Sequence, residues 1–283
     1  MKKTLLSTIA LAALLSTSAV SCGGNEATIK VAASDVPHAE ILNSTAVKNA
    51  VKEKGYTLEV TILDWTLQND EVNNGTYDAN YFQHRQYLQN WDSGSAIYDE
   101  TYTYQKLFPV ATIHSEPLRI YTGKGEKVLS QACTFVICND ATNSIRALDL
   151  LKANNLIEGY TLNEDGTLKL DDEGIHPYGL SNVTLIKESL LATSLSDYDF
   201  GVLPTNSALT GNIAVDETLP VEDSTQQLYR ANVLAASVSK YASDASYKTK
   251  IDVLVDVLLS SVTSEAIISL YSSVVVPVQV DLR

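Results

Sequence analysis

The order of apolar segments over residues 29–63 constrains the fold of this chain more than any other feature. Residues 29–34 and 57–63 are runs rich in aliphatic and β-branched side chains, as strands are. Between them, the apolar positions of residues 37–54 recur at helical spacing, and Gly55 follows as a helix stop. Because parallel strands need a crossover, usually a helix, this unit predicts an α/β fold with parallel pairing.

The alternation of strands and helices continues along the chain, without an internal repeat or a long linker. Strands are expected at 107–113, 118–122, 133–137, 183–186, 199–203 and 232–236, and helices at 142–153, 247–259 and 263–272. A polar segment, 160–178, carries a turn signal at 163–166. The length suits one large domain, or two lobes joined by short crossings near 117–123 and 225–232.

The N-terminal segment has the charged, apolar, small order of a secretory signal. Lys2 and Lys3 precede an apolar run, 5–15, which is too short to span a bilayer and leads through small residues to Cys22. A cysteine at this place resembles the lipobox of bacterial lipoproteins. We therefore expect removal of residues 1–21 and lipidation of Cys22, which anchors the chain through acyl chains; a plain signal peptide with a chance cysteine is the alternative.

The charge of the chain is strongly negative. Its formal net charge is −14, and removal of Lys2 and Lys3 would make it −16. A surface of this sign repels phosphate backbones, so nucleic acid is not expected as a partner.

Cys133 and Cys138 are expected to be free, buried thiols despite export. They flank a buried strand at an odd separation, which points them to opposite faces roughly 16 Å apart. A disulfide needs Cα atoms closer than about 7 Å. No second Cys or His lies two to four residues from either, so a metal site there is not expected.

Residues 78–91 concentrate rings in a chain that is only 7% aromatic. At helical spacing His84 would lie near Leu88 and Trp91, and Tyr81 near Arg85. Rings with polar edges suit a small ligand that is apolar at one end and polar at the other. The alternative is an amphipathic helix whose rings only fill the core.

Residues 139–148 form the second informative stretch, in which a buried strand ends, a polar turn follows and a helix begins at about Thr142. Helix N-termini offer unpaired amide donors that suit an anion such as an α-carboxylate. Arg146 lies in the first helical turn, where its guanidinium can fork onto that carboxylate. The alternative is an exposed arginine, or an ion pair with Asp149.

Catalytic signatures are missing from the sequence. It contains no Gly-x-Ser-x-Gly, no phosphate-binding loop and no His-Glu-x-x-His, so neither an enzyme nor a cofactor is expected. His38, His84 and His114 could still converge on a metal, although none has a second ligand at short spacing. A zinc-binding protein or metal-dependent hydrolase therefore remains an alternative.

The chain resembles the NLPA lipoprotein family, the methionine-binding lipoproteins that feed ABC importers. Residues 37–42 match that family's Pro-His-Ala-Glu-Ile-Leu, and residues 78–84 match its Asp-Ala-Asn-Phe-Phe-Gln-His. Residues 114–117 resemble His-x-Glu-Pro, and residues 139–148 resemble Asn-Asp-Pro-Thr-Asn-x-x-Arg-Ala-Leu. The matches keep their order over nearly all of residues 29–280.

The resemblance implies a two-lobed periplasmic-binding-protein fold of type 2, with the ligand in the cleft between the lobes. Residues 22–28 would be the tether, 29–117 and 229–283 lobe 1, and 118–228 lobe 2. The protein would sit on the extracytoplasmic side of the cell membrane. It would bind methionine or a related amino acid and deliver it to an ABC permease with its ATPase.

The resemblance also implies roles for individual residues. Phe82, His84 and Tyr87 would line the side-chain pocket, because a thioether packs favourably against rings. Arg146 would clamp the α-carboxylate, and Asn232 would help hold the α-amine. The full set of expected ligand-site residues is Trp65, Phe82, His84, Tyr87, Asn139, Asn143, Arg146, Asn206 and Asn232.

One departure from the family pattern bears on the ligand. The family's Ala-Val-Ile-Asn is Gly-Val-Leu-Pro here, so Pro204 replaces an asparagine that usually contacts the amino acid. Proline has neither a side-chain amide nor an N–H to replace it, and Asn206 is the nearest substitute. A surface lipoprotein with a vestigial cleft is therefore a further alternative.

Overall fold

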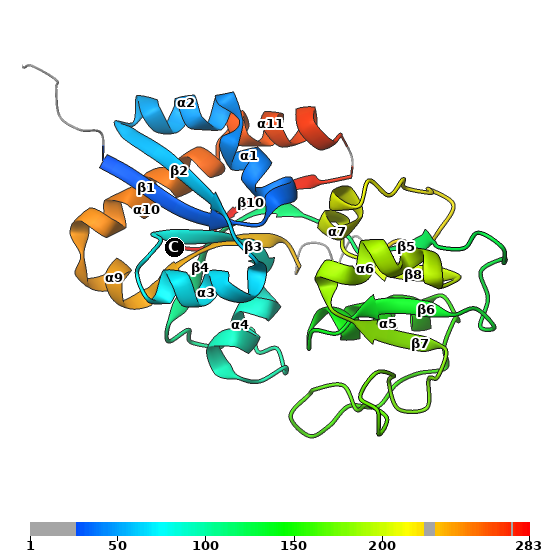
Figure 1. Cartoon of the computed structure of the whole chain (residues 1–283). Helices are drawn as coiled ribbons and strands as arrows, with labels where there is room; N and C mark the ends of the chain where they lie inside the picture. Colours follow the sequence, from blue (N-terminus) through cyan, green and yellow to red (C-terminus); the bar gives the residue numbers. More distant parts are fainter. Residues whose placement is uncertain (1–26, 224–229, 273) are drawn as a thin grey trace, which may run out of the picture.

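The computed structural model of the 283-residue chain describes residues 27–223, 230–272 and 274–283. The expected signal segment, 1–21, and Cys22 lie outside the described residues. The described part forms two lobes, each built around its own β-sheet, with the first and last parts of the chain in one lobe and the middle in the other (Figure 1). The predicted two-lobed α/β fold is confirmed.

The first lobe contains a sheet with the order β10-β4-β9-β3-β1-β2. Its strands are β1 (Ala27–Ala33), β2 (Tyr56–Ile62), β3 (Ala79–His84), β4 (Leu107–Ser115), β9 (Asn232–Ser237) and β10 (Val276–Asp281). β1 pairs parallel with both β2 and β3, as the first crossover unit predicts. The other pairings, through β9, β4 and β10, are antiparallel.

Helices cover both faces of this sheet. Alternate residues of β9 therefore point to two different cores, one on each face. Leu234 and Ala236 face a core that also contains residues of α1 (Glu40–Asn43), α2 (Thr45–Glu53), α10 (Ala245–Leu258) and α11 (Ser261–Tyr271). Val233 and Ala235 face the opposite side, together with Val72 of α3 (Trp65–Asn73) and Leu88 of α4 (Arg85–Ser93). A short helix, α9 (Val238–Ser243), follows β9.

Two helical predictions need correction. The continuous helix expected at 37–54 is a short π-helical turn, η1 (Asp35–Ala39), followed by α1 and α2; the helix breaks at Ser44, whose side chain caps α2 by accepting from the Val47 N–H. The helix considered for 78–91 is wrong for the first half of that stretch, which forms strand β3. β3 lies between β1 and β9, and the helix α4 begins only after His84. At residues 79–84, strand pairing overrides the local pattern.

The second lobe contains a sheet with the order β5-β8-β6-β7. Its elements are β5 (Arg119–Thr122), β6 (Phe135–Cys138), α5 (Asn143–Ala153), β7 (Val183–Ile186), α6 (Glu188–Ser194), η2 (Leu195–Asp197), β8 (Phe200–Leu203) and α7 (Thr205–Thr210). Cys133 belongs to one core of this lobe and Cys138 to the other. Both are free and buried, as predicted.

The two crossings between the lobes lie side by side. One runs from β4 to β5, and the other includes residues 220–222 before β9. The Glu222 N–H donates to the Leu118 carbonyl at 2.8 Å, and the Ile120 N–H donates to the Pro220 carbonyl at 3.0 Å. The lobe boundaries proposed from the sequence stay a prediction.

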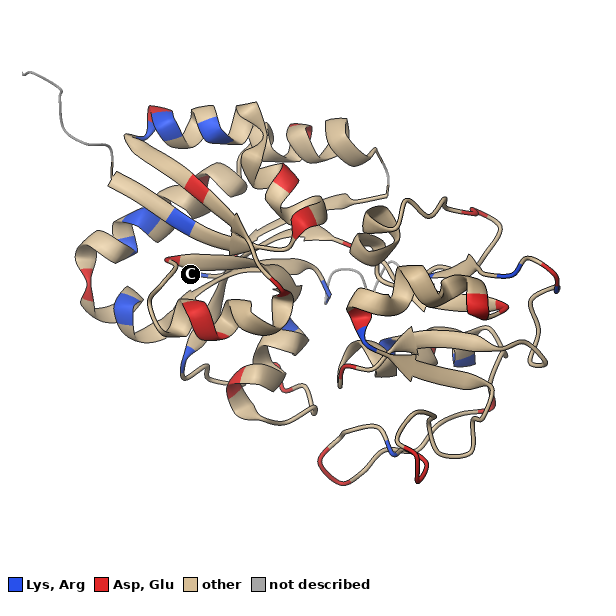
Figure 2. Ribbon diagram, in the orientation of Figure 1, with Lys and Arg blue, Asp and Glu red and all other residues tan. Residues whose placement is uncertain are grey.

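Acidic and basic positions are interspersed over both lobes rather than segregated onto one of them (Figure 2). Among the described residues, no single helix is long and apolar enough to cross a membrane. Helices α10 and α11 meet the criteria of length and composition only when taken together, and they are bent by 56° at their junction.

Candidate functional site

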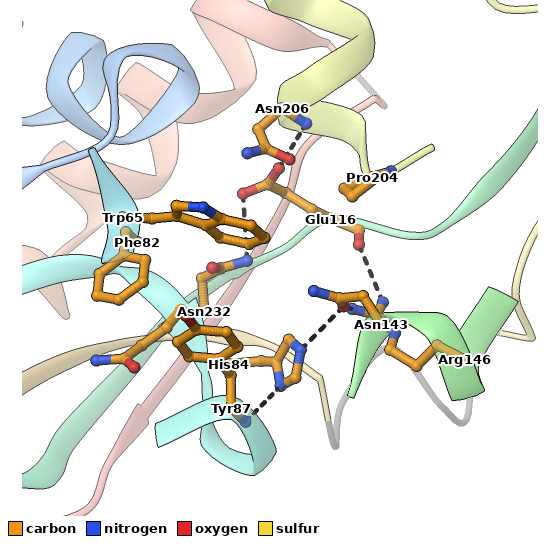
Figure 3. Close-up of a pocket in the computed structure, with 11 residues that line it drawn as sticks. Trp65, Phe82, His84, Tyr87, Glu116, Asn143, Arg146, Pro204, Asn206 and Asn232 are labelled. Atoms are coloured by element: carbon orange, nitrogen blue, oxygen red, sulfur yellow. Dashed lines mark hydrogen bonds between the residues drawn. The ribbon is translucent and has the colours of Figure 1, made fainter. Parts of the chain in front are cut away.

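A cavity that is partly open to solvent lies where the two lobes meet (Figure 3). Its lining residues are Trp65, Phe82, Gln83, His84, Tyr87, Glu116, Asn143, Arg146, Pro204, Asn206 and Asn232. Eight of the nine sequence-predicted site residues are among them. Asn139 is not: its side chain is exposed after β6, and its N–H donates to the Ile186 carbonyl.

The register of the first sheet brings two polar residues of the cavity, His84 and Asn232, next to His114. His84 ends β3 and Asn232 begins β9, and the two are paired residues in that ladder. On the other side of β9, Asn232 pairs with His114 of β4. Residues separated by up to 148 positions in the chain (232 − 84) thereby meet at one end of three interior strands of the sheet.

Three rings form an apolar wall on the first-lobe side of the cavity. The Trp65 indole stacks on the Tyr87 ring, with ring centroids 5.5 Å apart and planes at 16°. Phe82 meets Tyr87 edge to face at 5.8 Å. Trp65 is held at the start of α3, where the Asp64 carboxylate caps the helix by accepting from the Thr66 N–H. Trp65 also packs against an apolar cluster of the second lobe.

His84 connects the two lobes. Its Nδ1 accepts from the Tyr87 N–H at 3.1 Å and so caps α4, which leaves the proton of the neutral ring on Nε2. Nε2 then donates to Asn143 Oδ1 at 3.1 Å. Burial and the positive charges of Arg146 and Arg230 hold the pKa of His84 well below its ordinary value, so the ring is neutral at physiological pH.

The amide donors at the start of α5 are not open to an anion, contrary to the sequence expectation. Asp140 Oδ1 accepts from the N–H groups of Thr142 and Asn143, at 3.1 and 2.9 Å. It also accepts from the Thr142 hydroxyl at 3.0 Å. The protein's own carboxylate therefore occupies the position predicted for the ligand's carboxylate.

Arg146 is buried and bonded to Glu222, so the alternative of an exposed arginine or a pair with Asp149 is wrong. Its Nε donates to Glu222 Oε1 at 3.1 Å and its Nη2 donates to Glu222 Oε2 at 2.6 Å. Its Nη1 donates to Asn143 Oδ1 at 3.0 Å. Asp149 instead accepts from the Tyr160 hydroxyl. Sequence reasoning missed Glu222, which lies 76 residues from Arg146 in a polar segment without a pattern.

Glu116 supplies an acidic group at the other polar end of the cavity. Its Oε1 accepts from His114 Nε2 at 2.7 Å and from Asn232 Nδ2 at 3.2 Å, and its Oε2 accepts from the Asn206 N–H at 2.8 Å. Burial raises the pKa of this carboxyl above its ordinary value. Sequence reasoning missed its role, although it lies in the His-Ser-Glu-Pro run that carries part of the family resemblance.

The histidines do not converge as the metal alternative requires. His38 and His114 lie together, but their third neighbour is Glu116, and the three possible ligand atoms lie within 4.8 Å of one another. His84 is bonded to Asn143 instead. Two imidazoles and a carboxylate are a donor set that zinc accepts. Here they bond one another, and burial lowers the pKa of His38 to about 4 and that of His114 to about 3.

The chain is similar to known proteins along most of its length. The family model "NlpA lipoprotein" matches residues 29–279. The methionine-binding lipoprotein MetQ of Bacillus subtilis is 31% identical over 269 residues, which are 91% of this chain and 92% of that protein. A lipoprotein candidate from Ruminococcus gnavus has a similar crystal structure, with a TM-score of 0.69, 33% identity, and coverage of 89% and 99%.

A nutrient-binding protein from Burkholderia cenocepacia, solved with methionine bound, has a TM-score of 0.68 and 25% identity, over 88% of this chain and 99% of that one. The Bacillus protein is named a methionine-binding lipoprotein and the Burkholderia protein a nutrient-binding protein, which confirms the predicted class, a binding protein and not an enzyme. The match of sequence along nearly the whole folded chain, together with the shared two-lobed structure, shows that this chain belongs to the NlpA lipoprotein family.

Proposed function

We propose that this protein is the lipid-anchored solute-binding component of an ABC importer and that it binds methionine or a related amino acid. The observation that carries the proposal is one inter-lobe cavity with a ring-lined wall, an acidic group at one polar end and a guanidinium at the other. A zwitterion with an apolar side chain needs these three features together. The methionine named for MetQ and bound in the Burkholderia protein supports the same ligand class.

The cavity suggests how the ligand lies. A thioether would pack among Trp65, Phe82 and Tyr87, because sulfur contacts ring edges and faces favourably. An ammonium would lie beside Glu116 and Asn232, where a negative charge is otherwise buried with neutral imidazoles.

The carboxyl end would face Arg146 and the amide of Asn143. Pro204 lines the cavity but offers no donor; it precedes α7 as its cap residue, and its carbonyl accepts from the Ala208 N–H. Asn206, two residues further on, also lines the cavity.

Isothermal titration calorimetry of the purified protein tests the proposal. L-Methionine is expected to bind with a micromolar or lower Kd. L-Alanine should bind roughly thirtyfold more weakly, because losing three apolar groups costs about 2 kcal/mol. No heat with L-methionine, D-methionine or methionyl dipeptides would remove this ligand class. The same result, with no thermal shift from any amino acid, would favour the vestigial-cleft alternative.

Anchoring and delivery complete the proposal. Lobe closure over the ligand is a hinge motion whose closed state the permease would recognise. Lipidation of Cys22 would hold the protein at the membrane on the extracytoplasmic side, close to that permease.

Replacing Cys22 by serine tests the anchor. The variant should appear in the soluble extracytoplasmic fraction rather than in the membrane, with unchanged methionine affinity. Membrane retention of Cys22→Ser would show that the chain is held there by something other than this cysteine.

A further inference from the structure

Both anion-binding features at the carboxyl end of the cavity already hold a carboxylate of the protein itself. Asp140 takes the first amide donors of α5, and Glu222 takes the Nε and Nη2 edge of the Arg146 guanidinium. A ligand carboxylate therefore meets neither the open helix N-terminus nor the two-pronged edge that arginine usually presents to an anion.

Glu222 is held in place by several contacts, so a ligand would not displace it from Arg146. Its side chain is 6% exposed and does not line the cavity. Its Oε2 accepts from the Leu118 N–H at 3.3 Å, and Arg230 Nη1 lies 3.0 Å from its Oε1. Burial alone would raise the pKa of the Glu222 carboxyl, but Arg146 and Arg230 hold it below its ordinary value, so the group stays ionised.

Two donors remain on the cavity side. Asn143 Oδ1 accepts from both His84 Nε2 and Arg146 Nη1, so the network turns the Asn143 amide nitrogen toward the cavity (Figure 3). The other is the second N–H of Arg146 Nη1, whose first N–H donates to Asn143 Oδ1. This guanidinium already has Glu222 as a counterion, which it shares with Arg230. A neutral carbonyl oxygen can accept from both donors, as a carboxylate can.

We propose that the carboxyl end of this cavity selects an acceptor oxygen rather than a negative charge, so that the protein also binds amino-acid amides, with a neutral carboxamide in place of the α-carboxylate. The inference rests on the proposed function and narrows its ligand class. The reason is that the buried Arg146 guanidinium keeps Glu222 as its counterion when a neutral amide is bound. In a site whose arginine depends on the ligand for its counterion, the amide would bind more than about a hundredfold more weakly.

Calorimetry with L-methionine, L-methioninamide and 3-(methylthio)propylamine tests this, at a pH at which all three amines are protonated. Methioninamide is expected to bind within about tenfold of methionine, and the amine that lacks the carbonyl more weakly than both. Methionine binding more than about a hundredfold tighter than its amide would overturn the inference and leave the proposed function intact. Failure of all three to bind would overturn both.

Glu222→Gln provides the second arm, with Glu217→Gln as its matched control. Removing the internal carboxylate leaves the guanidinium with less compensation, so the preference for methionine over its amide should rise by roughly tenfold. Glu217 belongs to the same segment, but its side chain is 74% exposed and lies 3.6 Å from Arg119; its variant should keep the wild-type ratio. Because both ligands are titrated into the same folded variant, a general loss of stability affects both affinities alike and leaves their ratio unchanged. An unchanged ratio in Glu222→Gln would contradict the role assigned to Glu222.

Discussion

Replacing Arg146 by methionine is expected to lower the free energy of unfolding by about 3 kcal/mol, because it removes one partner from a buried ion pair. The side chains of Arg146 and Glu222 are 4% and 6% exposed and are joined by two hydrogen bonds. Arg230 remains beside Glu222 in the variant, which keeps the expected loss at the lower end for such pairs. Chemical denaturation, followed by circular dichroism, measures the loss.

The double variant Arg146→Met with Glu222→Gln should recover part of that stability, because no carboxylate is then left buried without its main partner. Lys248→Met is a suitable control: it breaks an exposed pair with Asp252 and should change stability far less. If the losses from Arg146→Met and Glu222→Gln simply add in the double variant, the two side chains do not stabilise the fold as a pair.

Replacing Trp65 by alanine is expected to weaken methionine binding by about 2 kcal/mol, or roughly thirtyfold. The indole belongs to the same wall of the cavity as Tyr87 and stacks on that ring, so its loss would remove a large apolar contact with the ligand. The fold should survive, because Trp65 lies at the first position of α3 and is only partly buried.

The only other tryptophan in the chain, Trp91, offers the matched control. It lies in α4, packs against the apolar cluster around Leu88 and carries Lys106 over its ring at 4.9 Å, away from the cavity. Trp91→Phe should therefore keep the wild-type affinity and any change of fluorescence on binding, whereas Trp65→Phe should lose that change. A fluorescence response that follows Trp91 instead would contradict the assignment of Trp65 to the ligand wall.

Much of the fold could be predicted from local pattern. β6 and β8 of the second lobe are continuous apolar runs, which burial on both faces of a sheet requires. The β1–β2 crossover unit is recognisable from two strand-forming segments with a helical pattern between them. The sequence did not reveal that residues 79–84 pair between β1 and β9, because a short run of rings and amides has no clear period. The short helices α3, α6, α7 and α9 also carry too few turns for a periodic signal.

The candidate site was predictable where it consists of short contiguous runs, such as Phe82 with His84 and Asn143 with Arg146. It was not predictable where a role depends on tertiary neighbours. Glu222 becomes the partner of Arg146 only because the second crossing lies against α5. Asn139 and Asn143 are equivalent by pattern, but only Asn143 lies on the helical turn that reaches the cavity.

The hydrogen bond from His84 Nε2 to Asn143 Oδ1 joins the first lobe to the second at the wall of the cavity itself. Because its two partners belong to different lobes, a rotation of one lobe relative to the other must break it. The same two side chains therefore couple the contents of the cavity to the angle between the lobes.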